Sequence, residues 1–376
     1  MKNTNPDNMW ENVCGQTRAV EILNRFIKSR RVPHALIFYG SEGVGKFNTV
    51  LNFAEAIYKE YSPDIHHIEK IQKLREPYIK LITPLPRGKG ETPDDSPTAK
   101  LTQNQVENLQ KEIEKLIENP YHKLNIDGAN TIKINSIRDI KKFICVDYHD
   151  IPYRFVFILD AHLMNDQAQN ALLKSLEEPP EGLVFILVTS KIDLLLPTIQ
   201  SRCWQIKFQP LSEKSVVDIL KSKFGIEDDS ARRAAHFSGG SVQKALKLIE
   251  YDIEFLLETV ISILRYSIAR KFHTASEHIN KLAGSKKGEE LALAIALIKV
   301  WLNDLIRNRF SYDDYYFEEF RDTLIKFNEK FPDAQVEKVF ENLTEYEKGL
   351  SGNLNLNVIT LSLIFELASL SMRNLN

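Results

Sequence analysis

Apolar positions in the first part of the chain follow two different spacings. At 17–29 and 47–61 they recur every three or four residues, which is the period of an amphipathic helix. At 34–40, 154–160 and 182–190 the apolar residues are consecutive instead, as in strands that are covered on both faces of a parallel sheet. Helical and strand patterns thus alternate, so we expect an α/β domain in which helices flank a parallel sheet.

Two segments between these strands have their own character. Residues 83–98 are crowded with proline and glycine, which excludes helix and central strand and predicts a mobile surface loop. Residues 165–178 have helical spacing, and this helix is expected to stop before Pro179 and Pro180. An amphipathic helix is also expected directly after the proline-rich segment. Its apolar side consists of Leu101, Val106, Leu109, Ile113, Leu116 and Ile117.

After about residue 208 the strand pattern ends. Three short helices are expected at 212–224, 230–238 and 241–251, and from 253 onwards the pattern is helical almost throughout. The candidate N-cap residues are Ser212, Ser230 and Ser241. We therefore expect three domains, namely an α/β domain over 1–208, a small helical domain over 209–252 and an all-helical domain over 253–376.

Composition narrows the class of protein. The 376 residues are 43% apolar and 27% charged with a net charge of −2, which is typical of a globular protein and excludes a generally polybasic nucleic-acid binder. The cysteines Cys14, Cys145 and Cys203 have no paired spacing, as in a reducing compartment. Neither an apolar leader segment nor an 18-residue apolar stretch is present. We expect a cytoplasmic protein that makes no membrane contact.

A glycine-rich loop carries the strongest chemical signal. Residues 40–47 read GSEGVGKF, which matches the phosphate loop G-x-x-x-x-G-K-[ST] except at its last position. Lys46 supplies a positive charge, whereas Phe47 stands where a hydroxyl would bind Mg²⁺. The glycines that let backbone N–H groups turn toward a phosphate are Gly40, Gly43 and Gly45. The alternative is a plain glycine turn with a surface lysine, but the strand before and the helix after favour a phosphate cradle with an impaired metal site.

A second strand end also bears on hydrolysis. Asp160 follows the apolar run at 154–159 and is the expected second carboxylate for a metal ion in this class of site. The next residue, where a glutamate would orient or deprotonate the attacking water, is Ala161. A methyl group does neither, so hydrolysis by this chain is expected to be slow. Taken alone, an aspartate at a strand end is more often a turn cap than a metal ligand.

Three longer stretches resemble one protein family. They read HALIFYGSEGVGK, FILDAHLMNDQAQNALLKSLEEPPEGLVFILVTS and LLPTIQSRCWQIKFQPLS, and they are similar to the clamp-loader branch of the AAA+ proteins, most strongly to its bacterial delta-prime family. The resemblance covers about residues 10–250. It implies an AAA+ domain, a helical lid domain and a C-terminal collar domain, with residues 83–120 as an insertion. The family motif residues are Glu177, Glu178, Ser201, Arg202 and Cys203.

This resemblance implies a role for one arginine. In the family, five subunits form a ring, and the arginine corresponding to Arg202 reaches the ATP site of a neighbouring gamma or tau subunit. A further arginine of the ATPase subunits corresponds to Gln243, which keeps hydrogen bonding without the charge. Phe47, Ala161 and Gln243 together predict a silent subunit that assists hydrolysis by a neighbour. Its implied partners are gamma/tau and delta subunits, and, through the ring, a sliding clamp and primer-template DNA.

The resemblance also sets expectations for cofactors. Many relatives carry four zinc-binding cysteines after the phosphate loop, but no cysteine lies between Cys14 and Cys145 here. His66 and His67 are adjacent, and successive side chains diverge, so they are expected to be solvated. We expect no zinc and no required cofactor, with at most passive binding of ATP or ADP.

Two other functions were weighed against this one. The first is an active clamp-loader ATPase of the gamma or tau type, in which Asp160 and a water replace the missing groups. The second is a small-molecule P-loop kinase or transferase, which would have no reason to carry the LEEPP and SRC motifs or a long helical C-terminal region.

Overall fold

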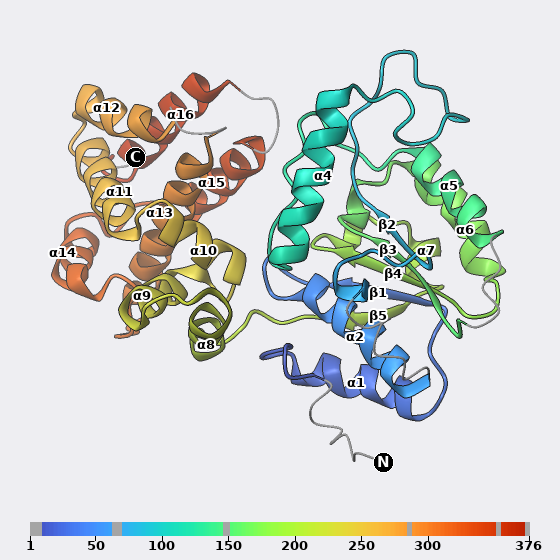
Figure 1. Ribbon diagram of the computed structural model, residues 1–376. Coiled ribbons are helices and arrows are strands. Elements are labelled where there is room, and N and C mark those ends of the chain that lie inside the picture. The colour runs from blue at the N-terminus through green and yellow to red at the C-terminus, as the bar shows by residue number, and fades with distance from the viewer. Residues whose placement is uncertain (1–9, 62–69, 146–150, 284–287, 351–354, 373–376) are drawn as a thin grey trace. The chain divides into compact units, whose positions relative to one another are not determined.

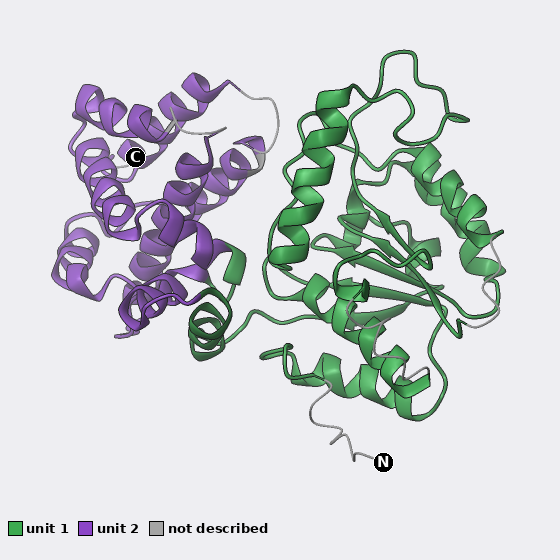
Figure 2. Ribbon diagram, in the orientation of Figure 1, with its two compact units in different colours: residues 1–224, 239–243 green, residues 225–238, 244–376 purple. Residues whose placement is uncertain are grey.

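The computed structural model describes residues 10–61, 70–145, 151–283, 288–350 and 355–372. The chain divides into two compact units. Unit 1 comprises Met1–Phe224 and Gly239–Gln243, and unit 2 comprises Gly225–Ser238 and Lys244–Asn376 (Figure 2). The expected three domains, with limits at 208 and 252, stay a prediction. No helix among the described residues has both the length and the apolar character that crossing a membrane would require.

The described part of unit 1 contains a parallel sheet of five strands in the order β2-β3-β4-β1-β5 (Figure 1). The strands are β1 Ala35–Tyr39, β2 Ile79–Ile82, β3 Arg154–Ile158, β4 Leu183–Thr189 and β5 Trp204–Lys207. The expected parallel sheet is therefore confirmed. The apolar pattern predicts β1, β3 and β4 but not β2 and β5, because each edge strand has four residues and buries only one side chain.

Helices cover both faces of this sheet, which explains the unbroken apolar runs. Along β1, Leu36 and Phe38 belong to a core with α1 and α2, whereas Ala35 and Ile37 belong to a second core with α5 and α6. Successive strand residues point to opposite faces, so both sets must be apolar. The helices with bounds in the described part of unit 1 are α1 Thr17–Lys28, α2 Lys46–Tyr61, α4 Gln103–Glu118, α5 Ile134–Ile144, α6 Asp166–Glu177, α7 Pro197–Gln200 and α8 Glu213–Phe224, with 3₁₀ turns η2 Ala161–Leu163 and η3 Ile192–Leu194.

The proline-rich segment forms neither helix nor strand, as expected, but it is not wholly a surface loop. Its first residues, 83–86, are buried. The ammonium group of Lys133, itself 9% exposed, donates to the carbonyl oxygens of Pro86 at 3.0 Å and Pro97 at 2.8 Å and pairs with Glu91 at 2.7 Å. The surface prediction is wrong for this part, because a buried cation needs acceptors that the carbonyl groups of this segment supply.

Helix α4 differs in detail from the helix that the apolar pattern predicts. It begins after Thr102, which forms a capping box, so Leu101 lies outside it. The two buried side chains of α4 are Leu116 and, unexpectedly, the carboxylate residue Glu112. Most of the apolar side of α4 is therefore not fully buried. Next to the buried Leu116, one turn earlier in the helix, lies the buried charged side chain of Glu112.

Unit 2 is all helical in its described residues. Two of the expected helix caps can be checked. Ser212 caps α8 of unit 1 as expected, because its Oγ accepts from the Ser215 N–H at 3.1 Å. Ser230 lies inside α9, so the prediction that it caps this helix is wrong. Asp304 is fully buried in α13 and accepts from the backbone N–H groups of Tyr316 and Phe317. The helices are α9 Asp228–Ser238, α11 Ile253–Ile268, α12 Phe272–Ala283, α13 Glu289–Arg309, α14 Arg321–Lys330, α15 Val336–Leu350 and α16 Leu356–Ser369, with η5 Glu318–Phe320, while α10 Val242–Glu250 crosses the unit limit.

Candidate functional site

The glycine loop at the carboxyl end of β1 has the backbone of a phosphate cradle. Gly40, Gly43 and Gly45 have φ angles of +145°, +74° and +92°, a region that residues with a β-carbon rarely adopt. A β-carbon on Gly40 would also lie 2.3 Å from the carbonyl oxygen of Phe208. Helix α2 starts at Lys46, directly after the loop, so its positive end faces this turn. Glycine is required here on both conformational and steric grounds.

Lys46 is turned toward its own loop. Its Nζ donates to the carbonyl oxygen of Gly40 at 2.7 Å and also to that of Ser41. Burial lowers the pKa of Lys46 to about 8, against the opposing influence of Glu42 and Asp160. The ammonium group is therefore satisfied by the protein, although a phosphate could replace the carbonyl groups as its partner.

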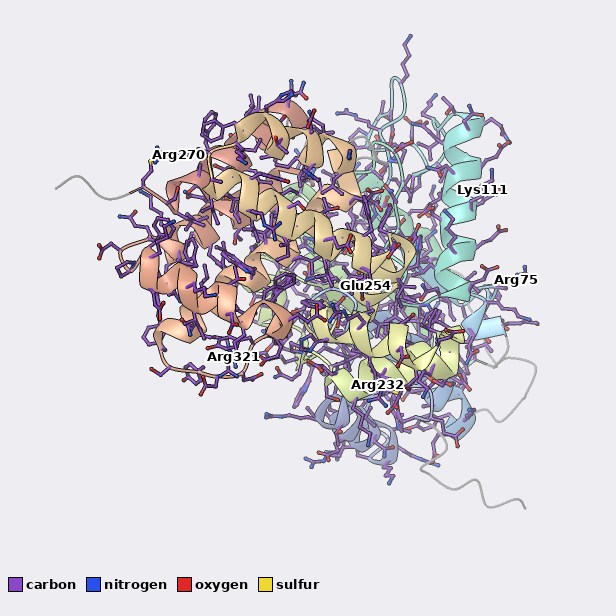
Figure 3. All side chains as sticks on the ribbon, turned by 90° about the vertical axis from the view of Figure 1, so that its left-hand side faces the viewer. Arg75, Lys111, Arg232, Glu254, Arg270 and Arg321 are labelled. Atoms are coloured by element: carbon purple, nitrogen blue, oxygen red, sulfur yellow. The ribbon has the colours of Figure 1, made fainter. Side chains whose placement is uncertain are left out.

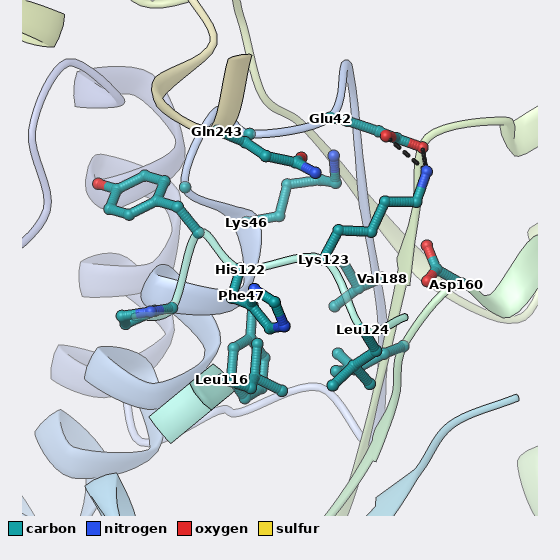
Figure 4. Close-up of a pocket in the computed structure, with 15 residues that line it drawn as sticks. Glu42, Lys46, Phe47, Leu116, His122, Lys123, Leu124, Asp160, Val188 and Gln243 are labelled. Carbon is teal, nitrogen blue, oxygen red and sulfur yellow. Dashed lines mark hydrogen bonds and ion pairs between the residues drawn. The ribbon is translucent and has the colours of Figure 1, made fainter. Parts of the chain in front are cut away.

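Phe47 belongs to the hydrophobic core and leaves the metal position without a hydroxyl. Its side chain is 6% exposed and packs in the core cluster that includes Val44 and Leu116. Phe47 and Leu116 also line one side of a cavity next to the loop, which Figure 4 shows. A phenyl ring donates no oxygen to Mg²⁺, which prefers oxygen ligands. The residue is thus used for packing.

The remaining predicted positions lie close to this loop or beneath it. Asp160 lines the cavity in a left-handed conformation with φ of +50°, and burial raises the pKa of its carboxyl group. Ala161 is fully buried in the core on the other face of the sheet and begins η2. Gln243 lines the cavity beside Gly43, whose carbonyl oxygen accepts from the Val242 N–H at 3.0 Å. The structure brings Asp160 and Gln243 to the loop but gives Ala161 no access to the cavity.

The cavity itself contains residues that the sequence did not indicate. It measures about 90 Å³, and part of its wall is the segment 119–125, which follows α4 and which we call the strap. Lys123 of the strap donates to both carboxylate oxygens of Glu42 at 2.8 Å (Figure 4). The lining residues are Glu42, Gly43, Gly45, Lys46, Phe47, Leu116, Pro120, Tyr121, His122, Lys123, Leu124, Leu159, Asp160, Val188 and Gln243. The sequence signal that could have indicated the strap is weak: a proline, Pro120, followed directly by an aromatic residue, Tyr121.

Arg202 lies outside this cavity, on the surface that follows α7. Its guanidinium donates to the Thr198 carbonyl oxygen at 2.9 Å and pairs with Glu177 at 2.7 Å. The Arg202 side chain is 36% exposed and that of Glu177 is 48% exposed. The SRC and LEEPP motifs thus meet in space. Of the other residues in these two motifs, Cys203 is buried, whereas Ser201 and Glu178 are exposed.

Metal binding has no visible support in the described part of the chain. No group of three or more His, Cys, Asp or Glu side chains is placed to hold a metal ion there. The three cysteines are unpaired, with Cys14 half-buried, Cys145 exposed and Cys203 buried. His66 and His67 lie outside the described residues. The absence of zinc stays a prediction.

The parallel sheet, the glycine loop after β1 and the helix that begins at Lys46 define unit 1 as an α/β P-loop domain. Within that class, residues 15–212, more than half of the chain, match the family described as "DNA polymerase III, delta subunit". The chain belongs to this family of AAA+ clamp-loader proteins.

Individual relatives have names from more than one subunit type. DNA polymerase III subunit gamma of Buchnera aphidicola is 39% identical over 137 residues, which cover 35% of this chain and 37% of that protein. Subunit delta′ of Escherichia coli is 33% identical over 141 residues, or 38% of this chain and 42% of that protein. A crystal structure of a gamma subunit-related protein from Thermotoga maritima covers 94% of this chain and 100% of its own at 18% identity, with a TM-score of 0.40. The chain spans less than half the length of these two curated relatives.

Proposed function

We propose that this chain is a delta-prime-like subunit of a bacterial clamp loader that acts in DNA replication in the cytoplasm. It hydrolyses no ATP itself and supplies Arg202 to the ATP site of a neighbouring gamma or tau subunit. Its partners are gamma/tau and delta subunits in a five-membered ring, which places a sliding clamp on primed DNA. It needs no cofactor of its own.

The observation that carries this proposal is the contrast between two sites. In the P loop, Phe47 is a core residue and Ala161 is buried away from the cavity, so neither a metal hydroxyl nor a group that activates water is supplied. Arg202, in comparison, is partly exposed, and its guanidinium is held by a hydrogen bond to the Thr198 carbonyl oxygen and by a surface ion pair with Glu177. Such a pair contributes only ~0.2–1 kcal/mol, so the guanidinium can exchange Glu177 for a phosphate on a partner at little cost.

The alternative is an active ATPase of the gamma or tau type, because a gamma relative is at least as similar to this chain as a delta′ relative. The cavity argues against it. Asp160, the carboxylate expected to bind a metal ion, lines the cavity, but the position of the metal-binding hydroxyl holds Phe47, a core residue that has no oxygen.

The decisive experiment is a reconstituted loader that contains the Arg202→Ala chain. A finger arginine is worth ~10³–10⁵ in rate at the site that it serves, so we expect DNA-stimulated ATP hydrolysis and clamp loading to fall while the ring still assembles. Arg138→Ala is the matched control, since Arg138 is also an exposed arginine of unit 1 with one surface ion pair, to Asp94. Full activity of the Arg202 variant would refute the assignment. A turnover near ~1 s⁻¹ by the purified wild-type chain would refute its silence.

A further inference from the structure

The strap lies next to the phosphate loop at two points. The Tyr121 ring lies over Gly45, where a β-carbon would be 3.5 Å from the Tyr121 Cε1 atom. Two residues further along, Lys123 Nζ forms the two 2.8 Å hydrogen bonds to Glu42, a residue of the loop itself. The strap and the phosphate loop therefore line the same cavity.

A buried carboxylate on α4 fixes the strap in this place. Glu112 is 3% exposed and accepts from the backbone N–H of Asn125 at 2.8 Å, and its other contacts are His122 Nε2 at 2.8 Å and Lys115 Nζ at 2.6 Å. Burial alone would raise the pKa of Glu112, but the hydrogen bonds from Lys115, Asn125 and His122 hold it below its ordinary value. A charged anchor thus holds the middle of the strap, at His122, and its end, at Asn125.

Tyr121 fills the space beside the loop with a ring. Its side chain is 6% exposed and has an edge contact with Phe224 at 6.5 Å between ring centroids, while Lys223 Nζ lies 5.7 Å from the ring centre. The cavity that remains next to it measures about 90 Å³. Pockets for drug-sized ligands have ~300–1,000 Å³, so the space that remains beside Tyr121 is small for a whole nucleotide.

The two cations of the cavity already have partners within the protein. Lys46 and Lys123 supply two positive charges, and Glu42 and Asp160 supply two carboxyl groups. In a site that is built for a triphosphate, the cations have to be matched by the phosphates. Here a phosphate would have to displace Glu42 from Lys123 and the loop carbonyl groups from Lys46.

We propose that the strap, residues 119–125, is an intramolecular occupant of the P loop that keeps nucleotide out. Tyr121 excludes a nucleotide by volume, Lys123 neutralises the loop carboxylate, and Glu112 holds both in position. This inference goes beyond the proposed function, because it concerns binding to the chain's own P loop and holds whether or not Arg202 acts on a neighbour.

The test measures binding of a fluorescent ADP to the full chain by polarisation, with and without Mg²⁺. The double variant Tyr121→Ala/Lys123→Ala removes both contacts, and we expect its affinity to be at least about tenfold higher than that of the wild type. Lys111→Ala is the control, because Lys111 is an exposed lysine on the same α4 (Figure 3) and touches no part of the cavity. The control should bind ADP as the wild type does.

A single variant covers the case in which the double variant does not fold, as judged by circular dichroism. Lys123 is 48% exposed, so Lys123→Ala is expected to fold and to raise the ADP affinity about two- to fivefold by releasing one surface ion pair. Equal affinities for the wild type and the folded strap variants would overturn the proposal. So would weaker binding by Lys123→Ala, since Lys123 would then be a phosphate ligand. Neither result would alter the outcome for Arg202→Ala in the reconstituted loader.

Discussion

The Phe47→Ser substitution separates two views of the last phosphate-loop position. On the sequence alone, it restores the motif G-x-x-x-x-G-K-[ST] and should recover a metal ligand. In the structure, however, Phe47 is 6% exposed in the core cluster that includes Val44, Val50 and Leu116. We therefore expect the substitution to destabilise unit 1 and to leave metal-dependent nucleotide binding weak.

The magnitude follows from burial. Truncation of a buried phenylalanine to alanine costs ~3–5 kcal/mol, because transfer free energy is lost and a cavity is left. A serine hydroxyl without a partner in that cavity adds ~1–3 kcal/mol. A domain has only ~5–15 kcal/mol of stability in total, so Phe47→Ser should leave unit 1 only marginally stable. Phe47→Leu, the matched control, keeps an apolar side chain and should cost no more than about 1.5 kcal/mol.

Urea unfolding followed by tryptophan fluorescence measures this difference, because Trp10 and Trp204 both lie in unit 1. With a slope of ~2 kcal/mol per molar urea, the combined loss of ~4–8 kcal/mol lowers the midpoint by about 2–4 M. Fluorescent ADP binding with and without Mg²⁺ completes the assay. An unchanged midpoint together with tight Mg²⁺-dependent binding would show that the ring is dispensable to the core and that the site was one hydroxyl short of function.

Two further predictions concern the surface pair and the buried carboxylates. Glu177→Gln removes the charge opposite Arg202, and both side chains are at least 36% exposed, so the free energy of unfolding should change by less than ~1 kcal/mol while the reconstituted loader keeps its DNA-stimulated ATPase. A loss as large as that of Arg202→Ala would contradict the surface role of the pair. Hydrogen bonds hold the pKa values of Glu91 and Glu112 below their ordinary range despite burial. These two carboxylates therefore stabilise the folded state above the unfolded pKa of ~4.3, and this stabilisation is lost as the pH falls through their folded pKa values. The urea midpoint of unit 1 should thus fall between about pH 5 and 3, less steeply in Glu112→Gln, and a profile that is identical in the variant would disprove this account.

Local patterns determined much of this protein by themselves. The unbroken apolar runs predict β1, β3 and β4, since strands that are covered on both faces need apolar side chains at every position. The glycines of the loop predict its backbone, because each adopts a φ angle that a β-carbon disfavours. The prolines after Glu178 predict the end of α6. In each case the physical cause acts within a few residues of the chain, so it is legible in the sequence.

Only the tertiary structure shows which segments that are distant in the sequence lie in contact. The pairing of Glu177 with Arg202 and the passage of Tyr121 and Lys123 over the loop at Gly45 join residues that lie 25 to about 80 positions apart. The buried Glu112 also escaped the pattern, because a carboxylate counts as polar in any periodicity argument. Its burial is tolerable only because His122, Lys115 and the Asn125 N–H converge on it, and that convergence exists solely in the folded chain.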